Sequence, residues 1–379
     1  IMILTNANIV LNNEVVLGSL KIEDGRIQAI DSGRMALPAA VDCEGGYLMP
    51  GLVELHTDNM EKHFTPRPGV AWPGMQAFKV HDAQMISAGI TTVFDAISVG
   101  DVVEVSERLN NLNRMANALK ESGERGLTRA DHLLHLRCEV SHKDTLHNFR
   151  HLLEAHPPQL VSIMDHSPGQ RQFANIDKYR QYYKGKYKLS DTELEAFIQR
   201  QTEASRIYSA DYRRAIADIC LDHGIPLASH DDATVAHVEE SLQHGMVIAE
   251  FPTTEEAARE AHRHGMAVLM GAPNVVRGGS HSGNVAAHAL ASEGLLDVLS
   301  SDYYPASLLD AAFKLVKDER NHYDLPAATR LVSQRPAEAA GLEDRGEIAI
   351  GKRADLIWCE GLEDHAHILH VWKDGNRVF

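Results

Sequence analysis

Six side chains able to bind a metal ion follow short, mostly apolar segments of this 379-residue sequence. All six are nitrogen or oxygen donors: His56, Asp58, Glu139, His166, His230 and Asp302. The first two are separated by one residue and follow the run at 52–55. Because residues i and i+2 of a strand project to the same side, we expect both side chains to reach one ion. Imidazole and carboxylate ligands without cysteine suit zinc, manganese or iron(II).

Eight short segments are predicted to be the strands that position these residues. They lie at 52–55, 91–95, 133–139, 160–165, 226–229, 247–251, 267–271 and 298–301, with helical stretches between them. Alternating strands and helices predict a parallel α/β sheet, and eight repeats predict a TIM-type (β/α)8 barrel. The alternative, an open doubly wound sheet, is disfavoured because no Gly-rich dinucleotide fingerprint follows the first strand. In a barrel, the strand C-termini share the rim where the active site lies.

The two ends of the chain are rich in short β segments. Residues 3–30 contain three of them, and residues 354–379 contain three more. These segments predict a small β-sandwich domain built from both termini, residues 1–50 with 345–379. The hydrolase barrel would then occupy residues 51–344.

The strand-end residues predict metal-assisted hydrolysis at a binuclear centre. We expect Glu139 to bridge two divalent ions, with His56 and Asp58 on the first and His166 and His230 on the second. The ions are expected to be zinc, with iron or manganese as alternatives. Water held between two cations loses a proton near neutral pH. Asp302 would bind one ion and accept that proton.

Composition limits the remaining classes of function. The formal net charge of −16 argues against a basic surface for nucleic acid. No apolar run approaches the length of a membrane span, and no signal peptide is recognisable at the N-terminus. The four scattered cysteines are typical of free thiols in a reducing compartment. We therefore expect a cytoplasmic enzyme with neither membrane nor nucleic acid as partner.

Several of these segments resemble the amidohydrolase superfamily over essentially the whole chain. They are residues 50–56, the strand-end ligands, Asp302 and residues 351–356. Longer motifs resemble a narrower family, the sugar-triphosphate diphosphatases of the carbon–phosphorus lyase pathway: residues 56–59, 65–68, 166–173, 229–234, 277–284 and 301–307. Two positions depart from the broad superfamily. Asp58 replaces the second histidine of its His-x-His motif, and Glu139 replaces its bridging carboxylated lysine. The narrower family shares the His-x-Asp.

The narrower resemblance implies a specific reaction in phosphonate catabolism. It is the hydrolysis of alpha-D-ribose 1-methylphosphonate 5-triphosphate to 5-phospho-alpha-D-ribose 1-methylphosphonate and pyrophosphate. The alternative within the superfamily is hydrolysis of a C–N bond, as in a cyclic amidase or a deaminase. A non-catalytic scaffold is a further alternative, but such a protein should have lost metal ligands that are present here.

Loop residues between the strands are candidates for binding the phosphorylated sugar. They are Arg67, Gln170, Arg171, Lys184, Lys186, Arg277, Ser280 and His281. Residues 167–225 are too many for a plain connection, so we expect a lid or wall of the site there. Its basic run would either hold phosphates or form a solvated face. Barrels with β extensions often pair, which is compatible with a homodimer, although the sequence does not determine the oligomeric state.

Overall fold

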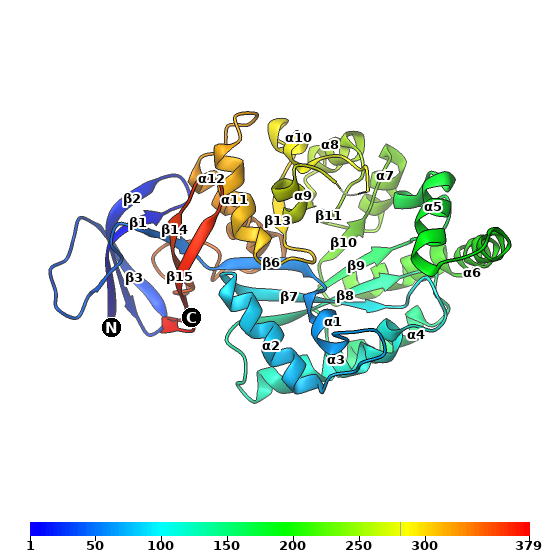
Figure 1. Ribbon diagram of the computed structural model, residues 1–379, viewed down its shortest axis with the longest axis horizontal. Coiled ribbons are helices and arrows are strands. Elements are labelled where there is room, and N and C mark those ends of the chain that lie inside the picture. Colours follow the sequence, from blue (N-terminus) through cyan, green and yellow to red (C-terminus); the bar gives the residue numbers. More distant parts are fainter. Residues whose placement is uncertain (281) are drawn as a thin grey trace. The chain divides into compact units, whose positions relative to one another are not determined.

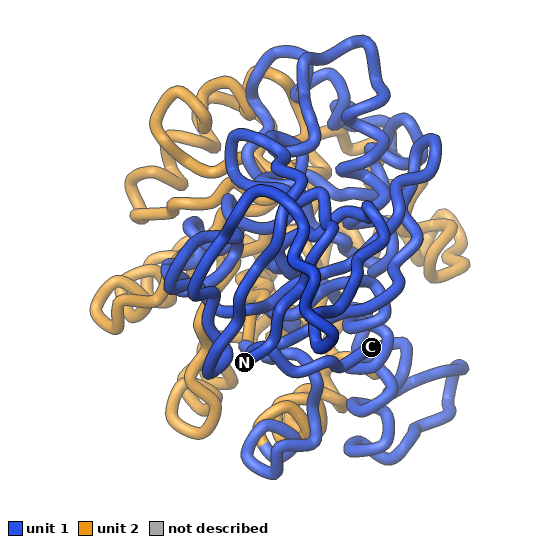
Figure 2. The backbone as a smooth tube through the Cα atoms, turned by 90° about the vertical axis from the view of Figure 1, so that its left-hand side faces the viewer, with its two compact units in different colours: residues 1–95, 121–133, 270–379 blue, residues 96–120, 134–269 orange. Residues whose placement is uncertain are grey.

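The structure is a computed structural model that describes residues 1–280 and 282–379. The chain divides into two compact units, coloured separately in Figure 2. Unit 1 contains residues 1–95, 121–133 and 270–379, and unit 2 contains residues 96–120 and 134–269. The predicted domain boundaries at residues 50/51 and 344/345 stay a prediction.

Both ends of the chain form one sheet within unit 1 (Figure 1). β1 pairs in parallel with β5, whereas the pairs β1–β2 and β5–β14 are antiparallel. Along the chain, the strands of this sheet are β1 (Met2–Val10), β2 (Val15–Glu23), β3 (Arg26–Ser32), β4 (Val41–Asp42), β5 (Tyr47–Pro50), β14 (Leu356–Gly361), β15 (Ala366–Lys373) and β16 (Asn376–Arg377). A buried cluster that includes Leu4, Ile9 and Trp372 packs against this sheet.

The eight strands expected in the middle of the chain are all present, and their order in the sheet follows the chain. They are β6 (Leu52–Thr57), β7 (Ile90–Val99), β8 (Asp131–Glu139), β9 (Leu160–Met164), β10 (Leu227–His230), β11 (Ile248–Glu250), β12 (Ala267–Gly271) and β13 (Val298–Ser300). A parallel bridge between Thr57 and Asp302 joins the end of β6 to the residues after β13. Every residue of β6 and β7 is buried, as expected for parallel strands covered on both faces. The predicted α/β barrel with a separate terminal sheet is confirmed.

Helices follow most of the strands. In unit 1 they are α1 (Asn59–Phe64), α2 (Gly74–Ser87), α9 (Ala272–Arg277), α10 (Ala287–Ser292), α11 (Ser307–Lys317), α12 (Leu325–Arg330) and α13 (Gln334–Ala339). Unit 2 holds most of α3 (Glu107–Glu124), and also α4 (Thr145–Ala155), η1 (Arg171–Phe173), α5 (Ile176–Tyr187), α6 (Asp191–Asp222), α7 (Val235–Gln243) and α8 (Glu255–Arg263). No helix within residues 1–280 and 282–379 is both long enough and apolar enough to cross a membrane.

The excursion at residues 167–225 is folded mainly into α5 and α6. The Asn175 side chain accepts two N–H groups in the first turn of α5, and the Ser190 side chain accepts one in the first turn of α6. Phe173, Tyr179, Tyr183 and Phe197 are among the residues of a separate buried cluster. This separate core packs the two helices against each other, so they form a wall of unit 2.

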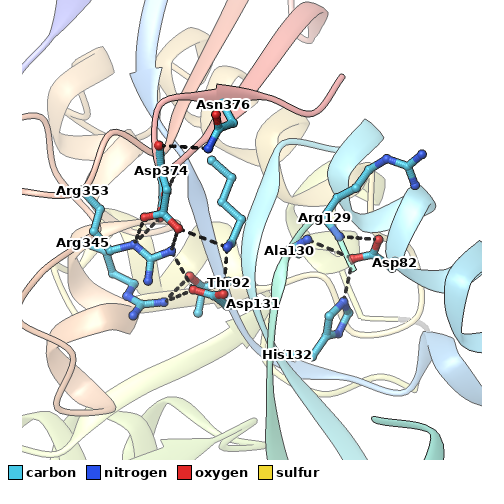
Figure 3. Close-up of polar contacts among 12 residues, drawn as sticks. Asp82, Thr92, Arg129, Ala130, Asp131, His132, Arg345, Arg353, Asp374 and Asn376 are labelled. Carbon is cyan, nitrogen blue, oxygen red and sulfur yellow. Dashed lines mark hydrogen bonds and ion pairs between the residues drawn. The ribbon is translucent and has the colours of Figure 1, made fainter. Parts of the chain in front are cut away.

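Ion pairs connect the terminal sheet to the start of β8 within unit 1 (Figure 3). Asp131 lies 2.9 Å from Arg345, 2.7 Å from Arg353 and 3.0 Å from Lys373. Arg353 also contacts Asp374 at 3.0 Å. The pKa of Asp131 is lowered because these cations outweigh the effect of its burial, which alone would raise it. All four cysteines are buried free thiols, which confirms the expectation of no disulfide framework.

Candidate active site

Three of the six predicted ligands lie together in unit 1. His56 is at the end of β6, Asp58 precedes α1, and Asp302 follows β13. The His56 Nε2 atom is 3.9 Å from an Asp302 carboxylate oxygen. The backbone of Asp302 accepts hydrogen bonds from the Thr57 hydroxyl at 3.0 Å and from the Asp58 N–H at 3.4 Å. Neighbouring strands of the barrel therefore bring the backbones of these residues together, and their shared binding of one ion stays a prediction.

A buried carboxylate supports this first group from behind. Glu54 accepts the backbone N–H of His56 at 2.8 Å and that of Ser301 at 2.6 Å, one oxygen to each. Burial raises the pKa of Glu54 to about 8, although both hydrogen bonds oppose the shift. Glu54 therefore fixes the ends of β6 and β13 against each other. The sequence pattern alone did not mark it as functional.

The other three predicted ligands lie together in unit 2. The Nδ1 of His166 donates to the Glu139 carboxylate at 2.7 Å. Glu139 also accepts the backbone N–H of His166 at 3.0 Å and the Ser141 hydroxyl at 2.7 Å. The rings of His166 and His230 are 5.6 Å apart between centroids. β8, β9 and β10 are consecutive parallel strands, so their C-terminal ends meet (Figure 1).

Asp231 joins this second group, although it was not among the predicted ligands. Its carboxylate is 2.8 Å from His230 Nδ1 and 3.4 Å from His166 Nε2. One ligand atom from each of these three residues lies within 4.8 Å of the others. Asp231 has a φ of +59°, an uncommon conformation that persists when surrounding structure holds it in place. Its signal in the sequence was the His-Asp-Asp run at 230–232.

The charges around His166 are those of a cation-binding site. Burial alone would lower the pKa of His166, but the carboxylates of Glu139 and Asp231 raise it to about 10. His230 and His166 in turn keep the pKa of Asp231 well below its usual range, although burial alone would raise it. A buried pocket that stabilises a protonated imidazole in this way has the donor atoms and negative charge to stabilise a divalent ion instead.

The predicted phosphate-binding residues have different surroundings. In unit 2, Arg171 is buried and paired with Asp232 at 2.8 Å and Glu240 at 2.6 Å. Lys184 is 2.5 Å from Asp191, and Lys186 lies over three tyrosine rings of α5.

Five further candidates remain. Arg67 and Arg277 are exposed in unit 1, and Gln170 is half-buried in unit 2. Ser280 is half-buried and its hydroxyl lies 3.0 Å from that of Ser282. His281, the remaining candidate, lies outside the described residues.

A second cluster of histidines and carboxylates lies in unit 1, between α2 and the strands. Asp95 on β7 is 2.6 Å from both His81 and His132, and His132 is 2.9 Å from Asp82. The contacts of His132 and Asp82 are visible in Figure 3. The chain of hydrogen bonds reaches Asn59, which is 3.1 Å from His81 and follows Asp58 directly. This cluster therefore supports the first turn of α1.

Comparison with known proteins gives close and distant relatives. Residues 47–378 match the model of the amidohydrolase family. The chain is 56% identical over 378 residues to the alpha-D-ribose 1-methylphosphonate 5-triphosphate diphosphatase of Escherichia coli (strain K12), covering 100% of both chains.

Two solved structures share the fold at low identity. A 5-methylcytosine deaminase from Klebsiella pneumoniae has a TM-score of 0.68 at 16% identity, covering 100% of this chain and 98% of that one. An N-acetyl-D-glucosamine-6-phosphate deacetylase from Mycobacterium smegmatis has a TM-score of 0.65 at 16% identity, covering 100% of both.

Proposed function

Because this chain belongs to the amidohydrolase family, we propose that it hydrolyses alpha-D-ribose 1-methylphosphonate 5-triphosphate to 5-phospho-alpha-D-ribose 1-methylphosphonate and pyrophosphate. The observation that carries the proposal is the 56% identity to the Escherichia coli enzyme of that name, over the full length of both chains. The segments of the sequence that resemble such diphosphatases include five of the six proposed metal ligands, all except Glu139.

The proposed cofactor is a pair of divalent metal ions, zinc before iron or manganese. We assign His56, Asp58 and Asp302 to one ion, and Glu139, His166 and His230 to the other. The donor set supports this assignment, because it offers nitrogen and oxygen atoms without a thiol. Ions held there would lower the pKa of the attacking water and neutralise charge on the phosphoryl oxygens. That Glu139 bridges the two ions stays a prediction.

Asp302 is the proposed general base. Its side chain is about one-third exposed, so water and substrate can reach its carboxylate. Its backbone is held by Thr57 and Asp58, which fixes the point from which the side chain projects. A carboxylate placed in this way accepts the proton of the attacking water and later returns it to the leaving oxygen.

The triphosphate is proposed to contact Arg67, Gln170, Arg277 and Ser280, with His281. Arg171 supports this surface in a different way, because its guanidinium binds Asp232 and Glu240. We propose that it positions the segment carrying Gln170. Lys184 and Lys186 belong to α5, where they remain candidates at the outer edge of the site. A cytoplasmic homodimer likewise stays a prediction.

The deciding experiment is product analysis by phosphorus NMR on the metal-loaded enzyme. Pyrophosphate should be released from the ribose triphosphate, and replacement Asp302→Asn should lower kcat by about 100-fold or more because the general base is lost. The folded state and metal content of the variant are measured in parallel. Turnover of cytosine or adenine without pyrophosphate release would instead support the C–N hydrolase alternative.

A further inference from the structure

A cavity of about 340 Å³ lies within unit 2, beside the loop that follows β8. Its walls are the loop at 101–104, the loop at 141–143 and one face of α6. Phe197, Arg200, Gln201 and Ala204 form that face, at spacings of three and four residues that align on one side of a helix. The volume falls within the range of small-molecule sites.

One residue that lines this cavity is hydrogen-bonded to a proposed metal ligand. Ser141 lines the cavity, and its hydroxyl donates to the Glu139 carboxylate at 2.7 Å. The Tyr212 hydroxyl on α6 donates to the backbone oxygen of Lys143 at 2.5 Å. The wall next to Glu139 is therefore fixed to the long helix, and a ligand in the cavity would have a defined position relative to Glu139.

Three of the residues that line the cavity carry nitrogen donors. His142 is only 5% exposed, and its Nδ1 accepts the Asp144 N–H at 3.1 Å, so the ring proton is on Nε2. That Nε2 has no hydrogen-bond partner within residues 1–280 and 282–379. Lys143 is 3.9 Å from Glu104, at the limit of an ion pair. Arg200 has no ion-pair partner among the residues that the structure describes. The cavity is thus lined by two cations and by a histidine whose buried N–H lacks a partner among the described residues.

The remaining lining residues restrict which anion fits. Asp101 and Glu104 line the same cavity and would repel a polyphosphate of several charges. Val102, Val103 and Ala204 add apolar surface. A methylphosphonate ester carries a single negative charge and a methyl group, so both kinds of surface suit it.

We propose that this cavity binds the 1-methylphosphonate group of the substrate, with His142, Lys143 and Arg200 toward its oxygens and the apolar residues toward its methyl. This inference rests on the proposed function. It assigns the cavity a role in selecting a phosphonate-bearing sugar over sugars that carry the same triphosphate alone.

The test compares two substrates that differ only in this group. Arg200→Gln and Lys143→Gln should each lower kcat/KM for ribose 1-methylphosphonate 5-triphosphate by about 10- to 100-fold, as expected for the loss of a charged hydrogen bond. For ribose 5-triphosphate the same variants should change kcat/KM by less than about 2-fold. Arg214→Gln is the matched control, because Arg214 lies on α6 outside the lining of the cavity.

Three outcomes would contradict the proposal in different ways. Unchanged kcat/KM in both variants, or an equal loss on both substrates, would overturn the assignment of the cavity while leaving the proposed function standing. If the unmodified enzyme releases pyrophosphate from neither substrate, the proposed function itself fails.

A direct binding measurement tests the cavity without turnover. The phosphorus NMR signal of ethyl methylphosphonate should broaden with the unmodified protein and not with Ala204→Trp, which fills the cavity. Equal broadening with both proteins would overturn the proposal.

Discussion

At the residue scale, Asp231 shows what spacing alone leaves open. The sequence places two aspartates after His230, and either one has the right chemistry to bind a metal. In the structure Asp231 contacts His166 and His230, whereas Asp232 pairs with Arg171. The backbone of Asp231, with its positive φ, decides which carboxylate faces the histidines. No local sequence pattern predicts this backbone conformation, so which aspartate faces the histidines depends on tertiary structure.

Replacing Asp231 with asparagine should weaken metal binding by about 10- to 100-fold, as is typical when a group that orients metal ligands is lost. The amide keeps the shape of the side chain but removes the charge that faces His166. Metal retained after dialysis against a graded series of chelator concentrations measures the effect. Asp177→Asn, an exposed carboxylate on α5, is the charge-matched control. Identical retention curves for both variants would exclude Asp231 from the site.

His132 should make stability depend on pH in a defined direction. Burial alone would lower its pKa, but Asp95 and Asp82 raise it to about 9, above its usual value of 6.5. Because the folded state holds this proton more tightly, its contribution to the free energy of unfolding is complete below pH 6.5 and is lost as the pH rises through about 9.

The variant His132→Gln should lose about 3 kcal/mol at pH 6.5, because it leaves two buried carboxylates without their cation. Its stability should then fall less steeply than that of the unmodified protein between pH 6.5 and 9.5. Urea denaturation at several pH values measures both quantities. Parallel curves would mean that His132 is not the titrating group.

At the element scale, Gly100 allows the chain after β7 to pack closely against the loop after β8. It has a φ of +83°, and a Cβ atom there would lie 2.2 Å from the Thr145 hydroxyl and 3.1 Å from the backbone oxygen of Glu139. Gly100→Ala should therefore displace that loop and destabilise the protein by about 2 kcal/mol or more.

Gly185 provides a matched comparison, because a Cβ atom there meets nothing within 4 Å inside α5. Gly185→Ala should be neutral or stabilising by up to about 1 kcal/mol. Thermal unfolding of both variants, together with kcat/KM, separates the two cases. A Gly100→Ala protein with unchanged unfolding and activity would show that the loop accommodates the added methyl group.

The strands were predictable because each carries its own signal. The segment expected at 267–271 coincides with β12, and the segment at 160–165 differs from β9 by one residue. Their apolar composition reflects burial on both faces, which depends little on the rest of the chain. Placing the ligands at strand ends follows directly from this, because parallel strands of a barrel share one rim.

The segment after β9 was less predictable. Arg171 looked like a phosphate ligand because of its charge and its loop position. Its partners, Asp232 and Glu240, lie 61 and 69 residues further along the chain. Long-range pairs of this kind leave no local trace in a single sequence. The cavity beside α6 was missed for the same reason, since it combines three segments that are far apart in the chain.

At the scale of the whole molecule, Arg353 holds the terminal sheet to the start of β8 in unit 1. It contacts Asp131, Asp355 and Asp374, and it is largely buried. Arg353→Ala should cost about 3 kcal/mol, because it leaves several carboxylates close together without their main cation. Arg34→Ala is the control, since Arg34 pairs with Asp42 on the surface and should cost less than about 1 kcal/mol. Equal melting temperatures for both variants would contradict this role.

The order of the terminal sheet also has a consequence for synthesis on the ribosome. β5 (Tyr47–Pro50) pairs on one side with β1, but its other neighbour is β14, about 300 residues later. At about 5–20 residues per second, that edge stays unpaired for roughly 15 to 60 s while the barrel is translated. An unpaired edge invites pairing with other chains. Pro50 offers no N–H at the end of β5, so the nascent chain presents a shorter edge to its neighbours.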